Sequence, residues 1–244
     1  RLSLKELLEL KIDTVYSASR RLQRTAEAPS SVSIVTSEEV KKYGHRTLTD
    51  ILQSVRGLYV AYDRNYSYLG LRGFNRPGDY NSRVLVMVNG HRLNDNVYDS
   101  ASIGTDFLLD VDLIERVEVV RGPTSSLYGN SAFFGVVNVV TKTGAQLPGV
   151  ELSGEAATFD TYKGRVTYGA RTDRGVGLLL SGSLYTSQGP ERLFYPEFND
   201  HNTNQGIAER RDQDDSRSFF GMISYHDLTL TGAFHSREKQ ITTA

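Results

Sequence analysis

The chain has 244 residues, of which 39% are hydrophobic and 23% charged, and its 28 basic residues nearly balance 29 acidic ones. This balance argues against a nucleic-acid-binding protein, and the lack of cysteine excludes disulfide scaffolds, zinc–thiolate sites and iron–sulfur clusters. No run of about 20 apolar residues occurs, which excludes a transmembrane helix but not membrane-spanning strands.

The first 30 residues predict little regular structure. Leucines recur near helical spacing over residues 2–11, with charged residues between them, which predicts one short amphipathic helix. Residues 12–30 lose this periodicity and are rich in Ser, Ala and Pro near their end. We therefore expect an extended, weakly ordered segment there.

The next region begins with a strand and two short helices. A β-branched strand is expected over 32–36, followed by a helix that Ser37 caps and Gly44 ends. Thr47 is expected to cap a second helix, which ends at Gly57. The apolar positions of this second helix repeat at helical spacing, so one of its faces is expected to be buried.

Short strands are expected wherever an apolar run ends at a turn signal. Asn89-Gly90 is a dipeptide that accepts positive φ angles and predicts a tight turn. The expected strands are Leu58–Tyr62, Leu69–Phe74, Val84–Val88, Leu113–Arg121 and Val136–Thr141. Together with the two helices, they predict a mixed α+β domain.

After Pro148-Gly149 the helical period disappears, and apolar and polar residues alternate in five segments of about ten residues. That length suits tilted strands that span a bilayer. The connections are the loops 160–162 and 187–216, expected outside, and the turns 172–175 and 226–227, expected inside. On periodicity alone, an ordinary sandwich or soluble barrel is an equal alternative. Because five strands would leave open edges, we expect them to be the first part of a larger barrel.

Five blocks, in order, resemble the plug domain of TonB-dependent outer-membrane receptors. The blocks are SVSIVTSEEV (31–40), TLTDILQSVRGLYV (47–60), LGLRGF (69–74), RVLVMVNGHRLN (83–94) and LIERVEVVRGPTSSLYGNSAFFGVVNVVTKTG (113–144). The last block is the most specific. Two departures retain the turn glycine: Arg56-Gly57-Leu58 where the family usually has Pro-Gly-Val, and Asn89-Gly90 where it often has Asp-Gly.

The resemblance implies an α+β plug domain, with a mixed sheet and short helices, followed by antiparallel transmembrane β-barrel strands. The implied regions are an N-terminal periplasmic segment (1–30), the plug (31–147) and the first five strands (148–244) of a barrel of roughly 22 strands. The rest of the barrel is expected to be missing from this chain.

The N-terminal segment contains a candidate TonB box, formed by Asp13, Thr14, Val15, Tyr16, Ser17 and Ala18. The family pattern usually has valine where Ser17 stands. Such a segment would pair with TonB as an added strand, main chain to main chain, which tolerates side-chain changes. The alternative is a plain linker.

Four charged residues are candidates for holding the plug inside the barrel. Arg72 and Arg121 belong to RGF and RGP motifs, and the resemblance implies that they face carboxylates on the inner barrel wall. Glu115 and Glu118 are expected to join this network. Bidentate pairing would suit a contact that must hold and later be released. The alternative is that all four are isolated surface charges.

Two apical plug loops are the candidate ligand-binding surface. Aromatic and polar residues are interleaved in them, and tyrosine offers a rigid contact area with a polar tip. The alternative is that exposed loops are polar in any protein. The candidate residues are Tyr62, Arg64, Asn65, Tyr66 and Tyr68 in the first loop, and Asn94, Asp95 and Tyr98 in the second.

No catalytic, metal or cofactor site is predicted. The five histidines are scattered without metal-ligand spacing, and the glycine-rich stretch Gly122–Asn130 lacks the Lys-Ser/Thr ending of a phosphate-binding loop. We therefore expect a protein that is not an enzyme and that needs no cofactor.

The resemblance implies active import of a scarce ligand across the outer membrane of a Gram-negative bacterium. A ferric siderophore is the commonest substrate, while cobalamin, heme and oligosaccharides use the same architecture. The implied partners are TonB with its inner-membrane energising complex, the small-molecule ligand and outer-membrane lipid. A non-transporting receptor for ligand binding or signalling, built on the plug, is the alternative.

Overall fold

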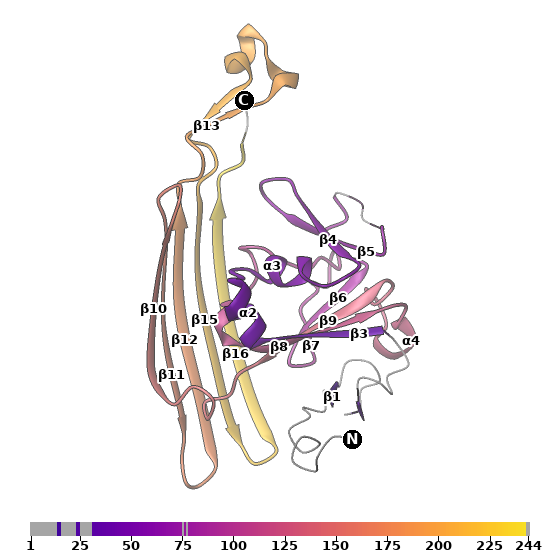
Figure 1. The fold of residues 1–244 in the computed structure, drawn as a ribbon, viewed down its shortest axis with the longest axis vertical. Helices are drawn as coiled ribbons and strands as arrows, with labels where there is room; N and C mark the ends of the chain where they lie inside the picture. The colour runs from indigo at the N-terminus through magenta and orange to yellow at the C-terminus, as the bar shows by residue number, and fades with distance from the viewer. Residues whose placement is uncertain (1–13, 16–22, 25–30, 75, 77, 243–244) are drawn as a thin grey trace, which may run out of the picture.

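The computed structural model describes residues 14–15, 23–24, 31–74, 76 and 78–242. Two parts lie side by side: a mixed α+β part that contains the plug-like blocks, called the plug below, and a sheet of five long strands, which we call the wall sheet (Figure 1). Among the first 30 residues, β1 (Thr14–Val15) pairs antiparallel with β2 (Gln23–Arg24). The helix expected over 2–11 lies outside the described residues.

A five-stranded mixed sheet forms the centre of the plug, in the order β3-β8-β9-β6-β7. β6 pairs parallel with β9, and the other neighbours are antiparallel. All residues of β6 are buried, as expected for an apolar run covered on both faces. The strands are β3 (Ser31–Thr36), β6 (Val84–Val88), β7 (His91–Arg92), β8 (Ile114–Arg121) and β9 (Gly135–Thr141). The predicted mixed sheet is confirmed.

The helix α2 (Ser37–Tyr43) begins one residue earlier than the predicted cap implies. Thr36, rather than Ser37, is the N-cap: its hydroxyl accepts from the Glu39 N–H at 3.3 Å, and the Glu39 carboxylate accepts from the Thr36 N–H at 2.8 Å. This reciprocal capping box satisfies two N–H groups at once, which Ser37 could not do with Glu39. Gly44 ends the helix at φ 69°, as predicted.

The helix α3 (Leu48–Gln53) is capped by Thr47, as predicted, but ends before Gly57. The Ser54 N–H donates to the carbonyls of Asp50 and Ile51, and the Val55 N–H donates to the Leu52 carbonyl, which closes the last turn. Gly57, with φ 87°, lies instead in the turn that leads into β4 (Leu58–Tyr62).

A hairpin of β4 and β5 (Ser67–Leu71) stands apart from the main plug sheet. β5 begins two residues before the predicted strand and ends at Leu71, because Arg72 and Gly73 adopt positive φ angles of 51° and 85°. The predicted turn at Asn89-Gly90 is confirmed, with φ angles of 49° and 82° between β6 and β7. The short helices η2 (Val111–Leu113) and α4 (Ser125–Tyr128) complete the plug.

The wall sheet follows chain order, β10-β11-β12-β15-β16, and all its neighbours are antiparallel. Its strands are β10 (Gly149–Ala157), β11 (Thr161–Arg171), β12 (Val176–Ser187), β15 (Asp214–Tyr225) and β16 (Leu228–Lys239). The predicted alternation is confirmed, since apolar side chains cover the face away from the plug. The exposed ones are Val150, Leu152, Tyr162, Val166, Tyr168, Leu184, Phe219, Ile223, Tyr225, Leu228, Leu230 and Phe234.

The connection between β12 and β15 extends beyond the wall sheet at the end where β10 and β11 meet (Figure 1). It contains a small hairpin of β13 (Arg192–Phe194) and β14 (Ile207–Glu209), with η3 (Pro196–Phe198) and η4 (His201–Gly206) between them. The two short turns lie at the opposite end of the sheet. We call the end with the long connection the apical end.

The core of the plug continues onto the inner face of the wall sheet. Leu179 of β12 and Phe220 and Met222 of β15 belong to the same buried cluster as the plug residues Ile51 and Phe107. In the described part of the chain, no helix is long and apolar enough to cross a membrane.

Candidate ligand site and plug–wall contacts

Asp63 shapes the tip of the β4–β5 hairpin. Its carboxylate accepts from the N–H groups of Asn65 and Tyr66, at 2.9 and 2.6 Å, and from the Tyr68 hydroxyl at 2.6 Å. Burial raises the pKa of the Asp63 carboxyl, but these hydrogen bonds outweigh burial and hold the pKa below its usual value. The tip is thus a preformed turn rather than a loose loop.

Tyr62 and Tyr66 present their rings beside this turn, with 57% and 38% of each residue exposed. The Tyr66 ring packs edge-on against Tyr80 at 5.1 Å. Partial burial, together with nearby Asp212 and Asp214, raises the pKa of Tyr62 to about 12, so its hydroxyl is a neutral donor near pH 7. Both rings are available to a ligand at the apical end.

Tyr68 and Asn94, two of the predicted ligand-binding residues, have internal positions instead. Tyr68 is 3% exposed and Asn94 is 4% exposed. The Asn94 amide accepts from the Val86 N–H at 2.8 Å and donates to the carbonyls of Val84 and Asp99. Both side chains are therefore buried within the plug in this structure, and contact with a ligand stays a prediction for these two residues.

The second predicted loop is organised by Asp95. Its carboxylate accepts from the N–H groups of Val97, Tyr98 and Ser100, each at 2.8 Å, and from the Ser100 hydroxyl. The Ser100 hydroxyl, followed by these N–H groups, holds the pKa of Asp95 well below its usual value. Of the residues predicted to bind ligand in this loop, Tyr98 is the most exposed, at 78%.

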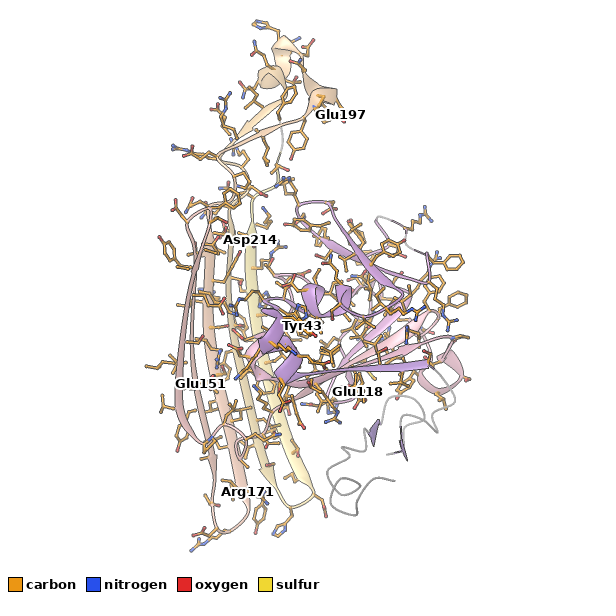
Figure 2. The ribbon with its side chains drawn as sticks, in the orientation of Figure 1. Tyr43, Glu118, Glu151, Arg171, Glu197 and Asp214 are labelled. Atoms are coloured by element: carbon orange, nitrogen blue, oxygen red, sulfur yellow. The ribbon has the colours of Figure 1, made fainter. Side chains whose placement is uncertain are left out.

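The hairpin tip is fastened to the apical end of the wall sheet by the apical cluster, defined as Arg64, Asp212, Asp214, Arg237 and Lys239. The Arg64 guanidinium lies 2.9 Å from the Asp212 carboxylate, and Lys239 forms an ion pair with the same carboxylate. Arg237 donates two 2.8 Å hydrogen bonds to Asp214. Figure 2 shows Asp214 near the apical end of the sheet.

Two further hydrogen bonds join this cluster to the plug. Arg237 donates to the Asn65 carbonyl at 2.9 Å, and the Thr105 hydroxyl donates to Asp214 at 2.7 Å. The tip residues Arg64 and Asn65, predicted to bind ligand, therefore contact the wall sheet. Bidentate arginine–carboxylate pairs are rigid, so they hold the tip in one place.

A second charged contact, the lower cluster, is defined as Asp110, Asp112, Glu151, Lys163 and Arg165. The Arg165 guanidinium lies 2.5 Å from Glu151 and 3.0 Å from Asp112, and the Lys163 amine lies 2.8 Å from Asp110. Arg165 is only 3% exposed. The plug supplies the two aspartates and the wall supplies both cations. Glu151 lies further from the apical end than Asp214 does (Figure 2).

Sequence reasoning missed the lower cluster as a plug–wall contact. The alternation of β11 indicated that Lys163 and Arg165 share the polar face, but their partners Asp110 and Asp112 lie about 50 positions earlier, where no local pattern points to them.

The four residues predicted to lock the plug each contact another plug residue. Arg121 donates to the Arg56 carbonyl at 2.6 Å and to the Ser33 hydroxyl at 3.0 Å. Arg72 donates to the Arg121 carbonyl at 3.1 Å. Glu118, fully buried, and Glu115 form ion pairs with Arg116, at 2.9 and 3.4 Å. A lock between these residues and further barrel strands stays a prediction.

The candidate TonB box is described in part. Thr14 and Val15 form β1, whose backbone pairs with β2, whereas Asp13, Tyr16, Ser17 and Ala18 lie outside the described residues. For the residues that the structure does describe, no group of three His, Asp or Glu side chains is placed to hold a metal ion.

Residues 24–136 match the family model described as the TonB-dependent Receptor Plug Domain. The chain contains a TonB-dependent receptor plug domain. The match includes β3 to β6, both capped helices and the hairpin that carries Tyr62 and Tyr66. The resemblance seen in the sequence is confirmed.

Curated relatives agree with this family. The chain is 30% identical over 179 residues to the vitamin B12 transporter BtuB of Vibrio vulnificus, covering 72% of this chain and 28% of that protein. It is 32% identical over 136 residues to an iron-regulated outer membrane virulence protein of Vibrio cholerae, covering 54% of this chain and 20% of the relative. The chain thus spans less than a third of the length of these relatives.

Solved structures show the same fold. The ferripyoverdine receptor of Pseudomonas aeruginosa superposes with a TM-score of 0.65 at 17% identity, covering 93% of this chain and 27% of that receptor. The ferric-catecholate import receptor Fiu of Escherichia coli K12 gives a TM-score of 0.64 at 17% identity, over 92% of this chain and 30% of Fiu. Both matches extend beyond the plug into the wall sheet, which therefore corresponds to the first part of a receptor barrel.

These relatives are transporters and receptors rather than enzymes, as expected. The expected location, the outer membrane of a Gram-negative bacterium, is also confirmed by the family.

Proposed function

We propose that the chain is part of a receptor that actively imports a ferric siderophore across the outer membrane, with TonB supplying the driving force. The observation that carries this proposal is the plug hairpin, whose exposed Tyr62 and Tyr66 lie beside a tip fixed to the wall by Arg64 and Asp212. A preformed aromatic surface at the apical end suits capture of the ligand. The plug beneath this surface would block direct passage, so release of the ligand into the periplasm would need energy.

The ligand class is argued from the surface and from the relatives. Tyr62, Tyr66 and Tyr98 offer flat rings with hydroxyl tips, which suit a bulky chelate that carries aromatic or hydroxamate groups. Two of the structural neighbours are a ferripyoverdine receptor and a ferric-catecholate import receptor. A relative named as a vitamin B12 transporter makes cobalamin the second candidate.

Energy coupling is assigned to residues 13–18, which would pair as an added strand with TonB and its inner-membrane energising complex. Pairing through main-chain hydrogen bonds needs an extended backbone, and Thr14–Val15 is extended in the structure. Pulling on this segment would act on the plug through β3, the first strand of its central sheet.

Release requires the plug–wall contacts to open. The lower cluster places the buried Arg165 cation against three carboxylates, so opening it would leave these charges without their partner. Arg72, Arg121, Glu115 and Glu118 would add contacts to further wall strands in the complete receptor. A plug held by ion pairs can return to the same position after each transport cycle.

The test is uptake by the complete receptor, produced in cells that lack their own receptors for the probes. Radiolabelled ferric enterobactin, ferric pyoverdine and cyanocobalamin are supplied to cells with and without TonB. Accumulation of a ferric siderophore only in cells with TonB supports the proposal. Accumulation of cyanocobalamin alone would reassign the ligand, and binding without any accumulation would favour the non-transporting receptor.

A further inference from the structure

A groove of about 930 Å³ crosses the wall sheet near its apical end, from β10 to β16. We call it the outer groove, because its walls are two rows of side chains that point away from the plug. In each row, neighbouring residues are paired across the strands. The residues between the rows, such as Lys163 and Ser216, point toward the plug, so their backbone forms the floor. The first row, nearer the apical end, is Ala156, Tyr162, Thr186, Asp215 and Glu238.

The second row provides the open space of the outer groove. Gly154 and Gly164 are paired with each other, and a Cβ atom added to either would meet no other atom within 4 Å. The exposed Leu184 side chain borders this space from the next strand. A pair of glycines beside an exposed leucine leaves room for an acyl chain to lie directly against the backbone. The second row is Gly154, Gly164, Leu184, Arg217 and Ser236.

The outer groove lies where the outward face of the wall sheet changes from apolar to polar. From the next row to the far end of the strands, the outward-facing positions carry no charged residue. The first row, by contrast, contains Asp215 and Glu238. A boundary of this kind is where lipid tails end and head groups begin. With the long connection outside the cell, the groove would lie at the head-group level of the outer leaflet.

Arg217 places an exposed cation at this boundary. It is paired across the strands with Leu184 on one side and Ser236 on the other, and neither side chain carries a charge. With the other described residues, its guanidinium forms no ion pair and no hydrogen bond. A guanidinium offers a fork of donors that matches a phosphate group. Arg217 is therefore free to bind the phosphate of a lipid whose chains lie along the apolar face.

Two carboxylates restrict which phosphate-bearing lipid suits the outer groove. Asp215 and Glu238 are paired across β15 and β16 on the outward face, and like charges that are directly opposite repel each other. The Asp215 carboxylate is held by the Thr186 hydroxyl at 2.5 Å and the Gln213 amide at 2.7 Å. A head group with negative charge alone would be repelled by both carboxylates. A head group whose phosphates are accompanied by divalent cations matches the whole charge pattern.

We infer that the outer groove binds one lipopolysaccharide molecule of the outer leaflet. A phosphate of its lipid A part pairs with Arg217, and one acyl chain lies over Gly154 and Gly164. The divalent cation that accompanies lipid A phosphates joins them to Asp215 and Glu238. This site is on the opposite face of the wall sheet from the plug, so its occupation needs neither TonB nor an imported ligand.

The test measures lipid binding by the complete receptor, purified in detergent with Mg²⁺ present. Deep-rough lipopolysaccharide, phosphatidylethanolamine and phosphatidylglycerol are titrated separately, and native mass spectrometry counts the bound molecules. We expect one tightly bound lipopolysaccharide per receptor. Arg217→Ala should weaken this binding by about tenfold, because it removes a charge-assisted pair, and Arg217→Lys should weaken it less. Equal or tighter binding of either phospholipid, or a receptor dimer that excludes lipopolysaccharide, would overturn the inference.

Gly164→Ile tests the acyl-chain part of the groove. The added side chain enters open space, so the strand should still form, but affinity for lipopolysaccharide should fall by about fivefold or more. Gly232→Ile is the matched control: Gly232 also has open space around it but lies further from the apical end, in the apolar band, so affinity should be unchanged. Equal affinities of Arg217→Ala, Gly164→Ile and the unsubstituted receptor would refute the site. A receptor that binds lipopolysaccharide as expected but imports no siderophore would support the site and contradict the import proposal.

Discussion

Arg64, at the tip of the plug hairpin, lies 2.9 Å from Asp212, which stands 148 positions later at the base of the long apical connection. The same aspartate forms an ion pair with Lys239 at the end of β16. One carboxylate thus joins the candidate ligand surface, the long connection and the wall sheet. Any force on one of these three elements reaches the other two through this contact.

A double-mutant cycle of Arg64→Ala and Asp212→Ala should measure the coupling between these two residues. Because the Arg64 side chain is 38% exposed, solvent screens the pair, and we expect a coupling energy of roughly 0.5–1 kcal/mol. Ligand affinity, measured by titration of the complete receptor, should fall by severalfold as the tip loosens. Arg192→Ala, which breaks the exposed pair with Glu209 in the β13–β14 hairpin, is the control; equal losses in both would refute the special role of Arg64.

Arg165→Leu should strongly destabilise the contact between plug and wall. It leaves Asp110, Asp112 and Glu151 without their shared cation in a site where Arg165 is 3% exposed, and removing one partner of a buried pair costs about 3–5 kcal/mol. Thermal unfolding of the detergent-solubilised receptor measures this loss. Arg171→Leu, at the exposed far end of β11, should change stability little.

Asn94→Ala tests whether Asn94, predicted to bind ligand, instead has a structural role. Its amide satisfies one buried N–H and two carbonyls, so truncation should cost about 1–3 kcal/mol of stability and disorder the 94–100 loop. Asn96→Ala is the control: this residue is exposed and two positions away, so its substitution should leave stability unchanged. Hydrogen exchange at the Val86 amide reports the change; unchanged protection with lost ligand affinity would mean that Asn94 contacts the ligand after all.

The hairpin tip should loosen in acid. Hydrogen bonds from Tyr66 and Tyr68 lower the pKa of Asp63 below its unfolded value near 3.8, so the charged carboxylate stabilises the tip above that pH. This contribution falls as the pH drops below 3.8 and through the folded pKa, because the carboxyl then binds a proton. Hydrogen exchange at the Asn65 and Tyr66 amides, followed from pH 6 to about 3, measures it.

Asp63→Asn should remove the acid dependence of exchange at the tip and leave those amides weakly protected throughout the range. Asp173→Asn, in the β11–β12 turn, should retain the acid dependence. Tip amides whose protection, relative to intrinsic exchange at each pH, is the same at pH 6 and at the lowest pH in the unsubstituted receptor would contradict the role of Asp63.

The local features of the fold could be predicted from the sequence, but the contacts between plug and wall could not. Thr47, Gly44 and Asn89-Gly90 act through bonds within a few residues, so their roles are visible in a short window. Thr36 displaced the predicted cap Ser37 because its partnership with Glu39 satisfies two groups rather than one. The local sequence allows either Thr36 or Ser37 to cap the helix, and the hydrogen-bond geometry of the folded chain decides between them.

The candidate site was predicted less completely. A tyrosine-rich loop indicates exposed rings, yet Tyr68 points inward because it follows the turn by one strand position and its hydroxyl reaches Asp63. Arg165 and Asp112 meet only after β11 has docked against η2, a relationship that no spacing in a single sequence encodes. The alternation of apolar and polar residues predicted which face of β11 is polar, but it could not predict which plug residues contact that face.

The most direct test of the proposed TonB-dependent import is uptake by a receptor altered only in the candidate box. Val15→Pro removes a main-chain N–H and disrupts strand addition, whereas Val15→Thr keeps the β-branched, extended residue. Radiolabelled ferric enterobactin uptake should be abolished in Val15→Pro, with binding unchanged, and retained in Val15→Thr. Uptake that persists in Val15→Pro, or in cells without TonB, would contradict energised import through this segment.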